Sequence, residues 1–322
     1  MTQTYTLEQI KTVCCQLDLS SEIEAGFVAY SAGQVKVPPV GELCFTEPPG
    51  DTHIKYGYIK NDDYFVIKIA SGFYQNPQLG LPSNSGLMLI FCQKTGIPKA
   101  LLLDEGYLTD VRTAIAGAIS ARYLAPENPS AIGVFGTGIQ ARMQVQYLKD
   151  LYPCRKVVAW GRSKESLHAY KADMSSMGFD VQTTNDPERV TAQCDLIITA
   201  TPSSQPLFDA QLVREGTHIT AMGADTPTKQ ELDAKLFTRA ELVVADSIPQ
   251  CIERGEIARA LQTGTIDKDR IQELGSIISS QTSARTAPEQ ISIADLTGVA
   301  VQDIQIAKAV FAQLQAQTTS YA

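Results

Sequence analysis

Apolar residues near the start of the chain recur at the spacing of a helix. Leu7, Ile10 and Cys14 lie three or four residues apart, and Ile23 and Phe27 repeat that interval farther along. Residues spaced in this way share one face of an α-helix. The spacing is interrupted around residues 20–21. The pattern therefore predicts two short amphipathic helices.

Between residues 35 and 91 the pattern becomes that of β-strands. Apolar side chains alternate over residues 64–69, and another apolar run covers residues 87–92. A period of two is typical of half-buried strands. Residues 94–96, Lys-Thr-Gly, predict a tight turn into a further strand at 100–103. We therefore expect a β-rich region here.

A segment rich in small residues follows, and beyond it strands alternate with helices. Residues 109–124 favour a helix whose backbone can be approached closely, and Pro126 and Pro129 end it. The expected strands then lie at 131–135, 156–160, 196–199, 218–221 and 242–245, with helices at 140–151, 163–177 and 298–314. Alternation at this spacing predicts a parallel sheet that is covered on both faces.

Length and composition fit a globular protein of two domains. The 322 residues correspond to roughly two domains at about 150 residues each. A formal charge of −8 disfavours nucleic acids and anionic membranes as partners. No apolar run approaches the roughly 18 residues of a membrane span, and no secretory signal is recognised. We therefore expect a cytoplasmic protein with no nucleic-acid or membrane partner.

Cysteine and histidine usage favours free thiols and no metal site. The seven cysteines include no C-x-x-C pair, and several lie in apolar runs, as buried thiols do. The three histidines leave little from which to build a zinc site.

One glycine-rich motif lies between a predicted strand and a predicted helix. It reads Gly136, Thr137, Gly138, Ile139, Gln140, Ala141 and fits G-x-G-x-x-A. The glycines of this motif let backbone N–H groups approach a pyrophosphate, whose charge the helix N-terminus stabilises. The motif predicts a Rossmann dinucleotide site. The alternative is a glycine turn in an α/β domain that binds no nucleotide.

The end of the next strand bears on which dinucleotide is bound. An Asp or Glu there usually binds the ribose 2′-hydroxyl of NAD, whereas this chain has Arg162, Ser163 and Lys164. Arg162 and its neighbours can pair with a 2′-phosphate through charge-assisted hydrogen bonds. We therefore favour NADP(H) over NAD(H). The alternative is that Arg162 stacks on the adenine or faces water.

Two further loops are expected at the carboxyl edge of the sheet, where ligands bind in such folds. The predicted cofactor residues in these loops are Thr199, Ala200, Thr201, Met222 and Gly223, to which we add Thr113 and Gly298. Asp225 places an acid at the same edge.

Four motifs in order along the chain resemble one known family. They cover residues 108–113, 136–141, 217–225 and 295–303, and together they resemble the ornithine cyclodeaminase and mu-crystallin family. Within that family, residues 80–88 and 104–110 are most similar to the ectoine-utilisation (EutC-like) branch.

The resemblance implies an α/β subunit of two domains. Residues 1–125 and 298–322 would form an α+β substrate-binding and dimerisation domain, and residues 126–297 would form a central Rossmann domain with a parallel, doubly wound sheet. The reaction implied is hydride transfer between nicotinamide and the α-carbon of an amino acid, through an imine. The implied assembly is a homodimer.

The resemblance also implies roles for four side chains. Lys68 and Arg112 match positions that hold the substrate α-carboxylate, Ser83 matches a neighbouring hydroxyl, and Asp225 matches the acid that handles a proton at the nitrogen. Each has a plainer interpretation: Lys68 is a buried lysine that needs a partner, Arg112 forms a structural salt bridge, and Asp225 caps a following helix.

Two positions depart from the cyclodeaminase pattern. Val40 stands where many relatives have a cation, and Lys55 stands where cyclodeaminases carry an acid. A cation facing the substrate would repel ornithine and attract a second carboxylate. We therefore expect a reductase of a small, dicarboxylic imino acid, of the iminosuccinate-to-aspartate type. The alternatives are an ornithine cyclodeaminase that forms proline, and a protein that binds NADPH and a small molecule without turnover.

Overall fold

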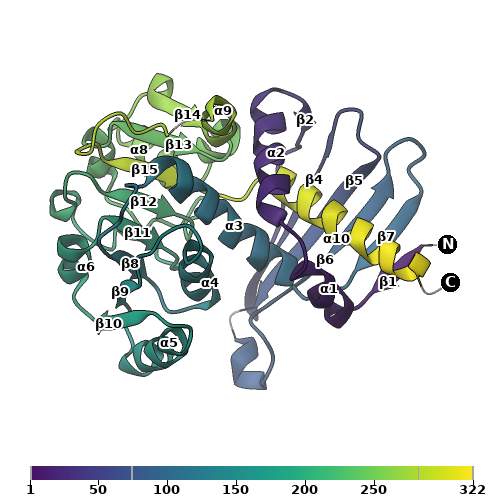
Figure 1. Ribbon diagram of the computed structural model, residues 1–322, viewed down its shortest axis with the longest axis horizontal. Coiled ribbons are helices and arrows are strands. Elements are labelled where there is room, and N and C mark those ends of the chain that lie inside the picture. Colours follow the sequence, from purple (N-terminus) through teal and green to yellow (C-terminus); the bar gives the residue numbers. More distant parts are fainter. Residues whose placement is uncertain (1, 74, 282, 321–322) are drawn as a thin grey trace. The chain divides into compact units, whose positions relative to one another are not determined.

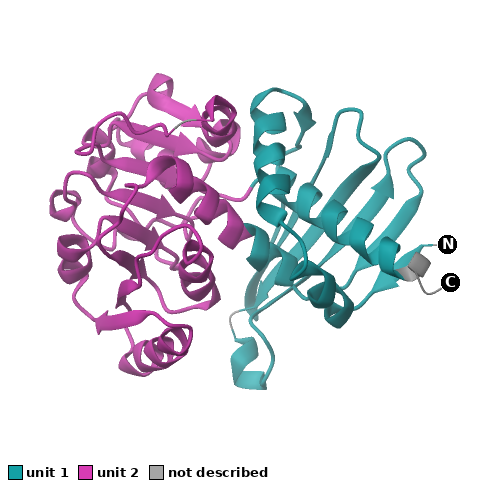
Figure 2. Ribbon diagram, viewed as in Figure 1, with its two compact units in different colours: residues 1–112, 299–322 teal, residues 113–298 magenta. Residues whose placement is uncertain are grey.

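The structure is a computed structural model that describes residues 2–73, 75–281 and 283–320. The chain divides into two compact units (Figure 2), one made of residues 1–112 and 299–322 and the other of residues 113–298. Both ends of the chain therefore belong to one unit. The sequence placed the first boundary at residue 125, whereas the units divide inside helix α3 (Tyr107–Leu124).

The first unit contains a seven-stranded sheet (Figure 1). Its strands are β1 (Gln3–Tyr5), β2 (Val35–Lys36), β3 (Gly41–Thr46), β4 (Pro49–Ile59), β5 (Tyr64–Phe73), β6 (Asn84–Cys92) and β7 (Pro98–Leu102). They run in the order β1-β7-β6-β5-β4-β2, with β3 also paired to β4. Only the β1–β7 pair is parallel among these described strands. The β-rich region expected from the sequence is confirmed.

Helices from both ends of the chain pack together in this unit. They are α1 (Leu7–Cys14), α2 (Leu19–Ser31) and α10 (Ala300–Ser320), and a short 3-10 turn, η1 (Asn76–Leu79), follows β5. Helix α10 contacts α2 and strands β4 to β6. At Gly26 a Cβ would lie only 2.8 Å from Cγ of Gln305, so glycine permits the close contact between α2 and α10.

The two faces of this sheet differ in burial. Val66, Met88 and Ile90 are buried on one face. The side chains that alternate with them, such as Ile67 and Leu89, are only half-buried, because successive residues of a strand point to opposite faces. One face of the sheet is therefore apolar and incompletely covered.

The second unit contains an eight-stranded parallel sheet. Its strands are β8 (Ile132–Phe135), β9 (Lys156–Trp160), β10 (Asp180–Thr184), β11 (Leu196–Thr199), β12 (His218–Ala221), β13 (Leu242–Ala245), β14 (Ile271–Glu273) and β15 (Ser292–Asp295). Their order is β10-β9-β8-β11-β12-β15-β13-β14. The sequence had predicted five of these strands and had missed β10, β14 and β15.

Hydrophobic clusters cover both faces of the parallel sheet. Val134 packs in one cluster with residues of α4 and α5, whereas its neighbour Phe135 packs in the other. The helices of this unit are the latter part of α3, α4 (Ile139–Leu148), α5 (Lys164–Ser176), α6 (Pro187–Gln193), α7 (Ile248–Cys251), α8 (Glu256–Gln262) and α9 (Leu274–Ser280), with 3-10 turns η2 (Ala210–Leu212), η3 (Ala234–Thr238) and η4 (Lys268–Arg270). The predicted α/β class with a doubly wound Rossmann sheet is confirmed.

Two further observations concern the class of protein. All seven cysteines are free thiols, as the sequence predicted. Within the described ranges, no helix combines the length and the apolar character needed to cross a membrane.

Candidate active site

The glycine motif forms the loop between β8 and α4. Gly136 has φ of +119°, a left-handed conformation that favours glycine, and a Cβ there would lie 2.6 Å from the carbonyl oxygen of Ala200. Gly138 is the N-cap of α4, and no atom of the described chain outside its immediate neighbours lies within 4 Å of a Cβ built there. The open space before the helix N-terminus fits the pyrophosphate of a dinucleotide.

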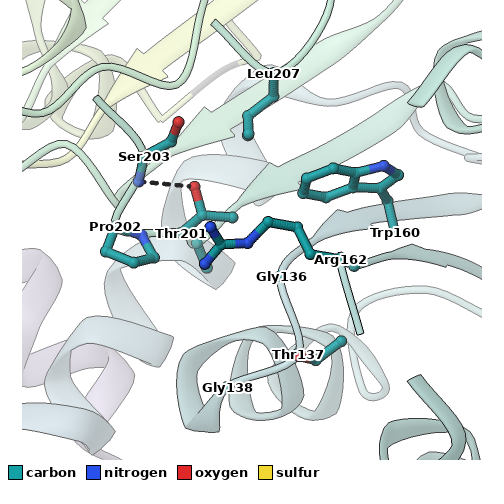
Figure 3. A pocket seen from close by; sticks show the side chains of 11 residues that line it. Gly136, Thr137, Gly138, Trp160, Arg162, Thr201, Pro202, Ser203 and Leu207 are labelled. Atoms are coloured by element: carbon teal, nitrogen blue, oxygen red, sulfur yellow. Dashed lines mark hydrogen bonds between the residues drawn. The ribbon is translucent and has the colours of Figure 1, made fainter. Parts of the chain in front are cut away.

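A cavity opens beside this loop at the carboxyl edge of the sheet (Figure 3). Six predicted cofactor residues line it: Gly136, Thr137, Gly138, Arg162, Ala200 and Thr201. The cavity is also lined by Trp160 and Leu207, which the sequence analysis had not assigned. Trp160 ends β9 directly before the Arg162 segment, so its place at a strand end was the available signal.

The remaining predicted cofactor residues lie outside the lining of this cavity. Ser163 caps α5, because its Oγ accepts from the N–H of Ser166 at 3.3 Å. Gly298 donates its N–H to Oδ2 of Asp246 at 2.6 Å. The others outside the lining are Ile139, Gln140, Thr113, Thr199, Met222 and Gly223.

Thr199 and Gly223 instead contact an acid that sequence reasoning missed. Thr199 Oγ1 and the N–H of Gly223 both donate to Oε2 of Glu231, each at 2.8 Å. Glu231 is completely buried.

Three cations gather on the buried face of the other unit's sheet. Lys55 and Lys68 are direct partners on β4 and β5, where opposite Cβ atoms lie about 4.5–5.5 Å apart. Lys68 Nζ lies 3.1 Å from Oδ2 of Asp303, and Arg112 Nε lies 3.0 Å from Oδ1 of the same carboxylate. Arg112 also donates to Oε1 of Gln302 at 3.1 Å. All these side chains except that of Gln302 carry charge, and all are buried.

The charged groups in this cluster shift one another's pKa values. The pKa of Lys68 is lowered to about 7, with burial as the largest cause; the charges of Arg112 and Lys55 also lower it, and Asp303 opposes them. Burial alone would raise the pKa of Asp303, but the three cations outweigh it and hold this pKa below its usual value. Asp303 is therefore the carboxylate that makes the buried cations tolerable.

Asp303 was not assigned a role from sequence. A signal was present, because Asp303 ends the motif 295–303 and a mid-strand lysine such as Lys68 needs a buried partner. Lys68 and Arg112 each form an ion pair with Asp303, as the plainer interpretation of these residues expects. The two ion pairs also fix the positions of both side chains.

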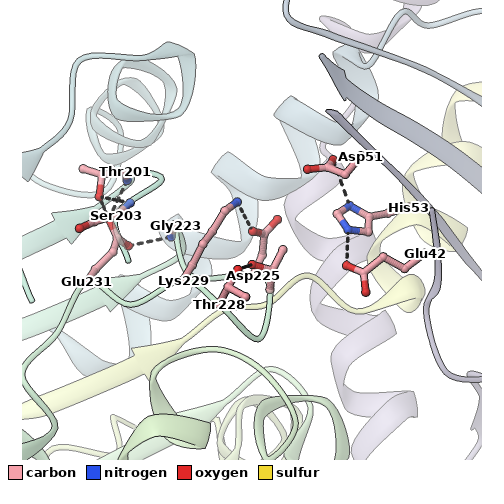
Figure 4. Close-up of polar contacts among 11 residues, drawn as sticks. Glu42, Asp51, His53, Thr201, Ser203, Gly223, Asp225, Thr228, Lys229 and Glu231 are labelled. Carbon is pink, nitrogen blue, oxygen red and sulfur yellow. Dashed lines mark hydrogen bonds and ion pairs between the residues drawn. The ribbon is translucent and has the colours of Figure 1, made fainter. Parts of the chain in front are cut away.

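Asp225 does not begin a helix, so the interpretation of this residue as a helix cap is wrong. Residues 222–229 form turns and irregular backbone, and Asp225 Oδ1 lies 2.7 Å from Nζ of Lys229 (Figure 4). The carboxylate is thus hydrogen-bonded to an ammonium group in a loop after β12.

The backbone of Ser83 lies away from the cation cluster. The carbonyl oxygen of Ser83 accepts from the N–H of Phe73 at 2.8 Å. Phe73 is five residues beyond Lys68 on β5, or about 16 Å along a strand. The structure brings Lys55, Lys68 and Arg112 together but does not place the backbone of Ser83 with them.

Replacing Asp303 by Asn should strongly destabilise the protein. The change leaves Lys68 and Arg112 buried without the negative charge that joins them, and removing one partner of a buried ion pair costs about 3 kcal/mol or more. Denaturant unfolding measures this loss. Asp62→Asn is the control, because Asp62 forms an ion pair with Lys308 of α10 at a partly exposed site. The expected loss of stability there is below about 1 kcal/mol. Equal losses would contradict the assignment.

Known proteins share this architecture along nearly the whole chain. A Rhizobium meliloti protein that is provisionally named a dehydrogenase is 40% identical over 296 residues, covering 91% of this chain and 90% of that protein. The structure of an archaeal alanine dehydrogenase dimer with bound NAD has a TM-score of 0.89 and 31% identity, covering 98% of this chain and 97% of the other. The iminosuccinate reductase of Paracoccus denitrificans in complex with NAD⁺ has a TM-score of 0.88 and 28% identity, with coverage of 98% and 97%.

The family expected from the motifs is confirmed. The finer likeness to the ectoine-utilisation branch stays a prediction. Residues 2–318 match the ornithine cyclodeaminase/mu-crystallin family, and the chain belongs to that family.

Proposed function

We propose that the protein is an NAD(P)-dependent oxidoreductase that reduces a small imino acid to an amino acid, with a dicarboxylic substrate of the iminosuccinate-to-aspartate type. The observation that carries the proposal is the buried cluster of Lys55, Lys68 and Arg112 around Asp303. The similarity to an iminosuccinate reductase and an alanine dehydrogenase supports the reaction class.

The charge of the cluster favours a substrate with two carboxylates. Its three cations face the carboxylate of Asp303, and Asp104 is the other acid close enough to Lys68 for their charges to interact. The three cations outnumber these two acids, and burial raises the pKa of Asp104. The cluster is therefore positive overall, and an anionic ligand offsets this buried charge.

Each side chain then has a distinct task. Lys68 and Arg112, fixed by Asp303, hold the α-carboxylate, and Lys55 holds the second carboxylate. When bound, NAD(P)H would supply the hydride that the imine carbon accepts. Asp225 handles the proton that the nitrogen takes up: its carboxylate accepts a proton from the Lys229 ammonium group, to which it is hydrogen-bonded, and passes it to the nitrogen, and solvent then restores the proton on Lys229. A carboxylate suits this proton transfer when it lies within hydrogen-bond reach of the nitrogen.

Steady-state assays with NADPH separate the candidate functions. Oxaloacetate with ammonium should be reduced to aspartate faster than pyruvate with ammonium is reduced, and faster than ornithine is converted to proline. Faster conversion of ornithine would favour a cyclodeaminase. Cofactor binding without turnover of any α-keto acid with ammonium would favour a binding protein.

The same assays with Lys55→Met test whether Lys55 binds the second carboxylate of the substrate. The change removes a charge-assisted contact, so kcat/KM for oxaloacetate with ammonium should fall about tenfold or more. The value for pyruvate should fall less than about threefold, because pyruvate has no second carboxylate. Lys60→Met is the control, since Lys60 is an exposed cation just beyond β4. Equal losses of kcat/KM for both keto acids would show that Lys55 does not bind the second carboxylate.

NADP(H) is the proposed preferred cofactor. Arg162 lines the cavity at the end of β9 (Figure 3), and no acid follows that strand directly. A guanidinium at this position can form charge-assisted hydrogen bonds to a 2′-phosphate.

Arg162→Ala should weaken NADPH binding about tenfold or more and NADH binding by less than about threefold. Quenching of Trp160, the single tryptophan of the chain, reports binding in the same cavity. Lys171→Ala on α5 is the exposed control. An equal loss for both nucleotides would contradict recognition of a 2′-phosphate by Arg162.

The incompletely covered sheet face is proposed to pair with a second copy of the chain. Ile67 and Leu89 lie on this face beside Tyr56, which is 38% exposed. An apolar patch of this kind is typical of an interface, and the similar alanine dehydrogenase is a dimer.

Analytical ultracentrifugation should therefore find a dimer, and Ile67→Glu should shift it to a monomer, because a charge would be buried at the interface. Ile97→Glu, at an exposed turn residue, should leave the dimer intact. A monomeric wild-type protein at micromolar concentration would refute the proposal.

A further inference from the structure

The buried carboxylate of Glu231 joins two separate loops at the edge of the parallel sheet (Figure 4). The N–H and Oγ1–H of Thr201 donate to Oε1 at 2.6 and 2.7 Å. Thr199 Oγ1 and the N–H of Gly223 donate to Oε2, each at 2.8 Å. Thr199 ends β11, Thr201 follows that strand, and Gly223 follows β12. One side chain therefore ties together the ends of two neighbouring strands.

The segment that Glu231 holds is a wall of the cofactor cavity. Thr201, Ser203 and Leu207 line that cavity. The backbone around Glu231 adds two bonds to this wall: Gln230 donates its N–H to the oxygen of Ser203, and Leu207 donates its N–H to the oxygen of Glu231, each at 2.8 Å. Glu231 is not part of the cavity lining itself, so it acts on the cavity through the wall.

The same carboxylate closes the loop that carries Asp225. Gly223 and Glu231 are the two ends of this loop, and their hydrogen bond joins them. A Cβ at Gly223 would lie 2.2 Å from the oxygen of Thr201 and 2.6 Å from Cδ and Oε2 of Glu231. The two ends of the loop therefore pack directly against each other and against Thr201. The loop that carries the Asp225–Lys229 pair is in this way attached to the cavity wall.

Two further buried acids, Glu256 and Asp295, hold the backbone that carries Glu231 in place. Oε1 and Oε2 of Glu256 accept from the N–H groups of Glu231 and Leu232 at 2.7 and 3.0 Å. Oδ2 of Asp295 accepts from the N–H of Ile257 at 2.8 Å. Each acid thus fixes the backbone that carries the next, from β15 to α8 and on to the cavity wall.

The hydrogen-bond pattern selects the ionised form of Glu231. All four contacts are donors, and the two backbone N–H groups cannot reverse their role, so a protonated carboxyl group would lose an acceptor. Burial raises the pKa of Glu231 to about 7 and that of Glu256 to about 8. The titratable groups around Glu231 are Glu256 and, beyond it, Asp295, with Arg259 on α8 and the Asp225–Lys229 pair on the loop that Glu231 closes.

We propose that Glu231 is a positioning residue that holds the cofactor-cavity wall and the Asp225 loop in one arrangement, and that only its ionised form does so. This inference rests on the proposed binding of a dinucleotide in that cavity. Cofactor affinity is then full at a pH where Glu231 is ionised and declines as the pH falls and the carboxyl group takes up a proton.

Glu231→Gln tests this inference by titration with NADH, followed by quenching of Trp160. NADH avoids the 2′-phosphate of NADPH, which titrates in a similar range. The amide offers one acceptor oxygen in place of two, so the dissociation constant should rise about tenfold or more. Wild-type affinity should weaken as the pH falls below about 7, whereas the variant should bind weakly with no such pH dependence. Its kcat should also fall, because the Asp225 loop is released.

Asp195→Asn is the matched control. Asp195 accepts hydrogen bonds from the N–H and the Oγ–H of Ser130 at 2.9 and 2.8 Å and so holds another loop in place. It lies at the amino-terminal edge of the same sheet, away from the cavity. This variant should lose stability and keep wild-type NADH affinity with its pH dependence. Thr199→Val removes one of the four donors, should raise the dissociation constant about threefold, and serves if Glu231→Gln does not fold.

Unchanged affinity and an unchanged pH profile in the Glu231 or Thr199 variant would overturn the inference. A wild-type protein that binds NADH with no pH dependence between pH values on either side of about 7 would overturn the requirement for the ionised form. Failure of the wild-type protein to bind any nicotinamide nucleotide would instead remove the proposed function, so the two failures are distinguishable.

Discussion

The carboxylate of Asp303 is the constraint on which the first unit depends. Lys68 and Arg112 are buried cations, and both contact this one acid. Two such charges cannot remain in a low-dielectric interior without a counter-charge. Asp303 reaches them from α10, so the last helix of the chain must pack on the sheet built near its beginning. The same contacts that complete the fold also fix the positions of the two cations that we propose hold the substrate.

Glycines and buried acids perform the corresponding task in the second unit. Gly136 lets the glycine loop approach Ala200, and Gly223 lets the next loop approach Glu231. Larger residues at either position would separate loops that now touch. The loops at the carboxyl edge of the parallel sheet are therefore closely packed and hydrogen-bonded to one another. A preformed site of this kind would suit the proposed dinucleotide, because its binding would then require little ordering of the protein.

Local patterns predicted the elements well where the sequence alone determines them. Residues 156–160 and 218–221 were expected as strands and are β9 and β12. Strand β15 was missed because Ser292 and Asp295 interrupt its short apolar pattern. Pairing with β12 and β13 places this segment in the sheet. Asp225 before a proline signals a helix cap, but the closed loop between Gly223 and Glu231 overrides that local preference. The roles of Asp303 and Glu231 depend on contacts with residues distant in sequence, which no local pattern contains.

In the proposed reaction, hydride passes from the nicotinamide to the α-carbon of a dicarboxylic imine that the buried cations hold. Isotope tracing tests it most directly: the protein is incubated with oxaloacetate, ammonium and NADPH that carries deuterium at the transferable position, and the aspartate formed is analysed by NMR. The proposed reaction gives aspartate with deuterium at its α-carbon. Aspartate without deuterium, or none formed while another imino acid is reduced, would contradict it.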